Sequence, residues 1–176
     1  MNRNFCSSST ALLTFTIQLF CMIENQLKKS GYALPVLPQS KGLYKRCVQV
    51  GRMLYVSGHI SVNADGSPIT GKLGAGCSEE EGVVAARQCG LAILAAIKEH
   101  FGSLDPIHRV VKLLGMVNAV PEFTNHAVII NGCSEVFRNL WGEELGVGAR
   151  NAVGMGSLPG GVAVEIEAIF ELKQDS

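Results

Sequence analysis

The residues near the C-terminus that could do chemistry are one arginine and three glutamates. Residues 162–170 alternate between apolar and polar positions, which predicts a strand with one buried face. The other face carries Glu165 and Glu167, and Glu171 follows at the same spacing. Arg150 precedes this strand in a segment that is rich in small residues. A guanidinium and carboxylates on one surface either pair with each other or leave room for a polar ligand between them.

The segment Pro159-Gly160-Gly161 predicts a turn that joins the two segments in a hairpin. In this register Arg150 lies opposite Glu171, and Gly156 lies opposite Glu165. The first-arm residues on the glutamate face are then Arg150, Ala152, Gly154 and Gly156. The alanine and the two glycines among them leave space for a ligand above the sheet. The alternative is a solvated Arg150–Glu171 pair without a ligand, worth roughly 0–1 kcal/mol.

The predicted hairpin separates its two most interesting residues. Arg150 and Glu165 would lie roughly 20 Å apart at about 3.3 Å per residue, which is too far to hold one small molecule on a flat hairpin. Either the sheet curls strongly or two chains contribute to one site.

Composition predicts one domain and argues against several classes of function. The chain has 176 residues, 47% of them hydrophobic, and no net charge. This length supports one sizeable core but no second domain. The sequence offers no basic patch of the kind that nucleic-acid binding requires. The six cysteines lack zinc-site or disulfide-framework spacing, and reduced thiols are typical of a cytosolic or matrix protein.

The first 21 residues differ in composition from the rest of the chain. They are rich in Ser and Thr, and no acidic residue precedes Glu24. The apolar stretch 11–21 is too short and too polar to span a bilayer. Met22 as the true initiator is the first interpretation, an organelle presequence the second and a secretory signal the third. We therefore expect a cytoplasmic protein, or a mitochondrial or plastid one if residues 1–21 are a presequence.

The remaining pattern predicts an N-terminal arm at 22–41 and a domain at 42–173. A capping box at Ser78–Glu81 starts a helix that continues to Phe101, and a second helix runs from Thr124 or Asn125 to Trp141. The expected strands are 45–50, 53–57, 110–120 and the two hairpin arms. This is an α+β fold of the split β-α-β kind, with two helices on one face of a mixed sheet of about six strands. The other face needs a cover, which self-association supplies most simply.

Two separated sequence blocks resemble the Rid family, also called the YjgF or L-PSP endoribonuclease family. The N-terminal block consists of Gly42-Leu43-Tyr44, Gly51-Arg52-Met53-Leu54-Tyr55-Val56-Ser57-Gly58-His59-Ile60 and Asn63-Ala64-Asp65-Gly66. The C-terminal block consists of Ala149-Arg150, Val153, Gly156, Leu158-Pro159 and Val164-Glu165-Ile166-Glu167-Ala168. Both blocks occur in the family's order, and the resemblance covers about residues 43–172.

The resemblance implies a chorismate-mutase-like subunit of the bacillus type in a homotrimer with clefts between neighbouring subunits. It also implies hydrolysis of enamines and imines such as 2-aminoacrylate to 2-keto acids and ammonia. The substrate carries a carboxylate, and neither a metal nor an organic cofactor takes part. No membrane partner is expected.

The family's functional residues carry over to individual positions of this chain. Arg150 matches the carboxylate-binding arginine, and Glu165 matches the glutamate that orients water. Gly58 matches the glycine whose N–H assists substrate binding, Tyr44 matches the aromatic residue at the cleft edge, and Ser57 lies beside them.

Three positions depart from the family pattern. Ala152, which we expect to line the substrate site, replaces a cysteine that many members have there. Asn151 stands where a small or apolar residue is usual, and His59 stands where glutamine is common. These departures affect the expected substrate choice more than the expected fold. The alternatives to a deaminase are a non-catalytic small-carboxylate-binding or chaperone-like trimer and, less favoured by the neutral charge, an endoribonuclease that inhibits translation.

Overall fold

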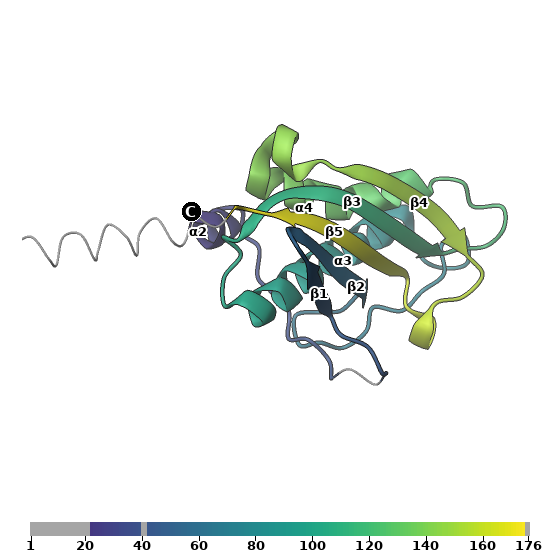
Figure 1. Ribbon diagram of the computed structural model, residues 1–176. Helices are drawn as coiled ribbons and strands as arrows, with labels where there is room; N and C mark the ends of the chain where they lie inside the picture. Colours follow the sequence, from purple (N-terminus) through teal and green to yellow (C-terminus); the bar gives the residue numbers. More distant parts are fainter. Residues whose placement is uncertain (1–21, 40–41, 175–176) are drawn as a thin grey trace, which may run out of the picture.

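The computed structural model describes residues 22–39 and 42–174 (Figure 1). Its elements, in order, are α2 (Met22–Lys29), β1 (Cys47–Val50), β2 (Met53–Ile60), α3 (Glu79–Phe101), β3 (Ile107–Asn118), α4 (His126–Gly146), β4 (Ala149–Met155), the 3₁₀ turn η1 (Pro159–Gly161) and β5 (Val164–Leu172). The predictions for residues 1–21 fall outside the described residues. No helix in the described ranges is long and apolar enough to cross a membrane.

The five strands form one mixed sheet in the order β1-β2-β5-β3-β4, and α3 and α4 cover one of its faces (Figure 1). Only β3 and β4 are parallel; the other neighbours are antiparallel. The α+β class and the two-helix layer are therefore confirmed. The described part of the chain has five strands in the sheet, where about six were expected. Residues 61–78 form only isolated bridges.

The helix α3 begins and ends where its sequence indicates. Ser78 accepts a hydrogen bond from the Glu81 backbone N–H, and the Glu81 carboxylate accepts one from the Ser78 N–H. This reciprocal pair satisfies two donors that a helix start leaves without partners. Gly102 ends the helix in a left-handed conformation at φ 77°, which glycine adopts without strain.

The expected hairpin between the last two strands is wrong. β4 pairs in parallel with β3, whereas β5 pairs with β2 and β3 and so lies in the middle of the sheet. The reason is the β3-α4-β4 unit, which places β4 beside β3 at the edge. The Pro159–Gly161 turn is part of the connection that carries the chain back to the centre. The alternation within β5 is confirmed, because the side chains from Val164 to Leu172 are buried at every second position.

The sheet face without helices is partly apolar in the single chain. Leu114 and Met116 of β3 are only partly buried, and Tyr55 of β2 and Val153 of β4 are exposed. Such a surface on a sheet favours contact with another chain. Self-association through this face remains a prediction.

The helix α2 packs against the connection between α3 and β3. Glu24 is buried, and its Oε1 accepts hydrogen bonds from the Leu104 N–H at 2.9 Å and the Ser103 hydroxyl at 3.2 Å. The Ile23 N–H also donates to Asp105 Oδ1 at 3.4 Å. These contacts fix the N-terminal arm on the domain.

Glu24→Ala is expected to lower the free energy of unfolding by about 1–3 kcal/mol, because it leaves the buried Leu104 N–H without an acceptor. Urea unfolding monitored by circular dichroism measures the change. The control is Glu122→Ala at an exposed glutamate, where we expect less than about 0.5 kcal/mol. Equal stability of the two variants would show that the contact adds nothing.

Candidate functional site

A pocket of about 610 Å³ lies along the part of β2 that β1 leaves unpaired. β1 pairs only with Met53–Val56, and the Ser57 N–H donates to the Arg46 carbonyl at 2.9 Å just before β1. Among the described residues, those from Gly58 to Ile60 have no strand partner on that side. The N-terminal arm, the loop after β2 and the connection before β5 close the space. Four of the predicted site residues line it, namely Tyr44, Ser57, Gly58 and Glu165. The fold therefore brings together residues from three distant parts of the sequence.

Glu165 lies on β5 between its two neighbouring strands, opposite Ile60 of β2 and Met116 of β3. Its carboxylate lies directly against Gly58, where a Cβ atom would overlap Oε1 of Glu165. A glycine at this position is therefore what allows the carboxylate to lie over the β2 backbone. The contact joins two of the residues that the sequence assigned to one site.

The environment of Glu165 favours its protonated form. Burial raises the pKa of this carboxyl above its ordinary value, and the neighbouring negative charge of Glu167 raises it further. A carboxylate with a raised pKa is a stronger base, which suits proton transfer near neutral pH.

His59 lies in the same pocket as a neutral ring. Burial lowers its pKa, the largest effect, although a hydrogen bond to the Ser57 carbonyl oxygen opposes the shift. His59 Nδ1 is 2.7 Å from that oxygen, so Nδ1 carries the proton and Nε2 is an acceptor. The Ser57 hydroxyl donates to the Lys45 carbonyl at 2.7 Å, so it can only accept a hydrogen bond from a ligand. Tyr44 lies at the rim and is 53% exposed.

Arg150 and Ala152 lie apart from this pocket. They pair with Leu113 and Gly115 of β3, whose positions face the helices, and not with β5. The expectation that Arg150, Ala152 and Gly154 share the glutamate face is therefore wrong. Their strand, β4, lies at the sheet edge beside β3. The positions of Arg150, Ala152 and Gly154 are therefore on the helix side of the sheet and not on the glutamate side.

Hydrogen bonds hold the Arg150 side chain on α4. Nη1 donates to Asn131 Oδ1 at 2.8 Å and to the Ser134 hydroxyl at 3.0 Å, and Nη2 donates to the Ala127 carbonyl at 3.3 Å. All three acceptors are neutral. Arg150 lines a second pocket of about 490 Å³ beside the end of α4.

Glu171 does not pair with Arg150, contrary to the alternative considered from the sequence. Its carboxylate contacts Arg52 at 2.7 Å and Arg109 at 3.7 Å. Arg52 directly precedes β2, and Arg109 lies on β3. Both β2 and β3 are neighbours of β5. The wrong pairing follows from the wrong hairpin.

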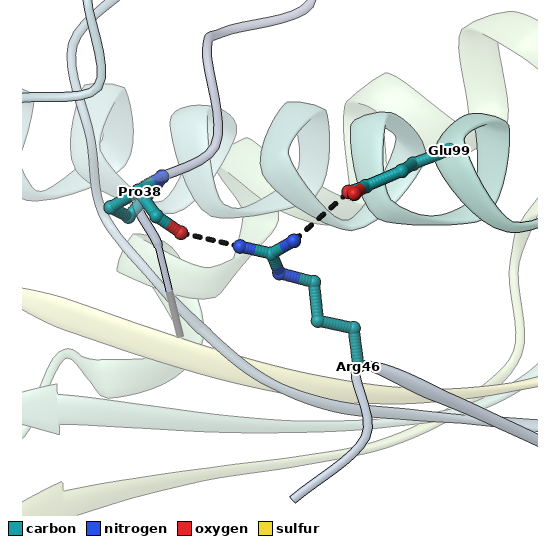
Figure 2. A network of polar contacts seen from close by, with 3 residues as sticks. All are labelled: Pro38, Arg46 and Glu99. Atoms are coloured by element: carbon teal, nitrogen blue, oxygen red, sulfur yellow. Dashed lines mark hydrogen bonds and ion pairs between the residues drawn. The ribbon is translucent and has the colours of Figure 1, made fainter. Parts of the chain in front are cut away.

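The pocket also contains a cation that sequence reasoning missed. Arg46 lines the same space as Glu165, and its Nη1 donates to Glu99 Oε2 of α3 at 3.0 Å. Its Nη2 donates to the Pro38 carbonyl of the arm (Figure 2). The only sequence signal was its position two residues after Tyr44, because nothing in the sequence indicates its contacts with Pro38 and Glu99.

The described cysteines are poor nucleophiles in this structure. Burial raises the pKa of Cys47 to about 11 and that of Cys133 to about 12. The thiolate form that attacks a substrate is therefore disfavoured. Among residues 22–39 and 42–174, no group of three or more His, Cys, Asp or Glu side chains could hold a metal ion.

Comparison with known proteins identifies the family. The profile described as "YjgF/chorismate mutase-like, putative endoribonuclease" matches residues 24–158. The chain belongs to the YjgF/Rid family. The five-stranded mixed sheet with two helices on one face is the family's chorismate-mutase-like subunit.

Members of the YjgF/Rid family resemble the chain to different degrees. Protein TCP17 of Trypanosoma cruzi is 40% identical over 150 residues, which cover 85% of this chain and 94% of the relative. The crystal structure of Atu1372 from Agrobacterium tumefaciens, of unknown function, has 38% identity and a TM-score of 0.78, covering 87% of this chain and 94% of that one.

The likeness to a RidA structure is weaker. RidA from the Antarctic bacterium Psychrobacter sp. PAMC 21119 has 27% identity and a TM-score of 0.53, covering 77% of this chain and 93% of that one. Family membership fixes the fold and the location of the motifs, whereas the activity needs its own argument.

Proposed function

We propose that this protein hydrolyses reactive enamines and imines of the 2-aminoacrylate type to 2-keto acids and ammonia. The observation that carries the proposal is the Glu165 carboxylate, which is half-buried beside Gly58 in a pocket of about 610 Å³. Such a group can hold and deprotonate a water molecule next to a bound substrate. Enamine substrates enter the reaction as their imine tautomers after protonation at carbon.

The chemistry requires one base and good positioning. Water attacks the electrophilic imine carbon, one of its protons passes by way of Glu165 to the imine nitrogen, and a carbinolamine forms. The hydroxyl proton of the carbinolamine then passes by way of Glu165 to the same nitrogen, and the C–N bond breaks with loss of ammonia as the carbonyl forms. One water and one imine thus give one keto acid and one ammonia. Because the imine carbon is already electrophilic, orientation of water and substrate supplies most of the acceleration.

A second copy of the chain supplies Arg150 in this proposal. Arg150 lies on the edge strand β4, and its own chain has Glu165 on the other face of the sheet. Three of the guanidinium N–H groups bind α4. A guanidinium has five N–H groups, so two remain for a bidentate contact with a substrate carboxylate. A cyclic trimer would place this edge next to a neighbour's pocket.

Mixing two inactive variants tests both the activity and the shared site. Arg150→Gln and Glu165→Gln should each lose acceleration of keto-acid release from enzymatically generated 2-aminoacrylate. Unfolding and refolding them together at equal amounts should restore about a quarter of the sites in a cyclic trimer, because each restored site takes one intact residue from each variant.

Each arm of this experiment has a distinct meaning. No recovery on mixing would place Arg150 outside the site or both residues in one chain. No acceleration by the wild type would reject the deaminase and favour the second candidate, a non-catalytic carboxylate-binding protein, which the presence of Arg46 in the pocket supports. Cleavage of RNA at low salt by the purified protein would instead favour the endoribonuclease in the family's description.

A further inference from the structure

Arg46 is the only arginine or lysine that lines the Glu165 pocket in the described part of the chain. Glu165 is the only carboxylate there. Arg46 precedes β1 and Glu165 lies on β5, so β2 runs between their attachment points. Two strand spacings correspond to roughly 10 Å. The described residues contain no ion pair between Arg46 and Glu165, whose charges thus remain available at different parts of the pocket.

The Arg46 side chain is held in place before any ligand binds. The Pro38 carbonyl and the Glu99 carboxylate each accept one of its N–H groups (Figure 2). Because a guanidinium has five such groups, three remain, enough for a two-hydrogen-bond contact with a carboxylate. An arginine fixed in this way loses little conformational freedom on binding.

The ion pair with Glu99 does not cancel the charge that Arg46 presents to the pocket. The Arg46 side chain is 24% exposed, whereas that of Glu99 is 62% exposed. Water therefore screens Glu99 more strongly than the inner side of Arg46. An exposed pair of this kind has a small net energy, so a buried carboxylate can compete for the guanidinium.

The pocket of the single chain has room for a substrate larger than a three-carbon acid. A volume of about 610 Å³ lies well within the range of sites for drug-sized ligands. The pocket is also lined by the apolar residues Leu37, Val62 and Val162. A four- or five-carbon chain would cross this space and carry a polar group to Arg46.

We infer that Arg46 binds a carboxylate on the substrate's side chain, so that the pocket prefers imines and enamines of dicarboxylic amino acids. This inference rests on the proposed deaminase function and adds the substrate class. Glu165 acts at the imine carbon, Arg150 of a second copy binds the carboxylate beside it, and Arg46 binds the distant one. Arg46 is thus a specificity-determining residue.

The test compares a diacid and a monoacid imine on the same variants. Iminosuccinate and 2-iminopropanoate are generated in situ by amino-acid oxidases, and kcat/KM for keto-acid release is measured for each. The wild type should prefer iminosuccinate, and Arg46→Gln should reduce this preference by about 10- to 100-fold. Arg46→Lys should keep part of it, because the charge remains but the planar fork is lost. Arg52→Gln, at an exposed and ion-paired arginine that lines neither pocket, is the matched control.

The outcome separates this inference from the proposed function. A preference ratio that Arg46→Gln leaves unchanged would overturn the role of Arg46 while the deaminase stands. If the wild type accelerates neither reaction, the deaminase fails, and calorimetric binding of succinate and butyrate then decides the role of Arg46. If the wild type binds succinate more tightly than butyrate and Arg46→Gln abolishes this difference, carboxylate recognition by Arg46 is supported. Equal binding of the two acids by the wild type would overturn it.

Discussion

Glu165→Gln is expected to lower kcat for imine hydrolysis by about 10²- to 10⁴-fold, the usual contribution of a positioned general base. The amide keeps the size of the side chain and can still bind water, but it cannot take a proton. Keto-acid release under saturating substrate measures the loss. A second variant, Gly58→Ala, should also reduce kcat, because the added methyl group takes the space of the Glu165 carboxylate.

The pH dependence of the wild type identifies the same group. The pKa of Glu165 is raised by burial and by Glu167, so kcat/KM should increase with pH through an acid limb above the ordinary range for glutamate. Glu167→Gln removes the neighbouring charge and should move this limb to lower pH. The limb should disappear in the residual activity of Glu165→Gln.

The raised pKa of Glu165 should also make the free energy of unfolding decrease as pH rises. Because the pKa of Glu165 is higher in the folded than in the unfolded state, its ionisation disfavours the folded state. Its contribution to the free energy of unfolding therefore falls as pH rises from the unfolded to the folded pKa.

A Glu165→Gln variant that folds normally and keeps both its rate and its acid limb would contradict the assignment of this residue as the base.

The features predicted correctly from the sequence depend on neighbouring residues. The start of α3 was predictable because Ser78 and Glu81 satisfy each other's backbone donors within one turn. The buried face of β5 was predictable because alternation is a property of a single strand. The assignment of Glu165 and Gly58 to one site came only from the family resemblance, since these residues of β2 and β5 are more than a hundred positions apart in the sequence.

The errors concern pairing between distant segments. Pro159-Gly160-Gly161 has the local chemistry of a hairpin turn, but turn residues do not determine which strands pair. The short connection between α4 and β4 was the better signal, because a strand, a helix and a strand in sequence favour a parallel pair. Once β4 moved to the edge beside β3, Arg150 moved to the helix face. Arg46 could not be assigned because Pro38 and Glu99 reach it only after folding.

The contact between α3 and α4 depends on a glycine at the point of closest approach. A Cβ atom at Gly132 would overlap the Val83 carbonyl oxygen and would lie 3.0 Å from the Val83 carbonyl carbon and 3.2 Å from the Arg87 nitrogen. These are backbone atoms of α3, so no rotamer change can relieve the clash. Among the described elements, these two helices cover this face of the sheet. Any separation between them therefore disturbs the packing that both make on the strands.

Gly132→Ala is expected to lower the free energy of unfolding by about 3 kcal/mol, because overpacking against a backbone exceeds the roughly 1 kcal/mol that alanine gains in helix propensity. For a domain of this size the midpoint of thermal unfolding should fall by roughly 6–12 °C. The control is Gly156→Ala, at an exposed glycine where a Cβ meets no atom within 4 Å. There we expect a change within about 0.5 kcal/mol. If Gly132→Ala instead stabilised the protein, helix propensity would outweigh packing, and the helices would lie farther apart in solution than the structure shows.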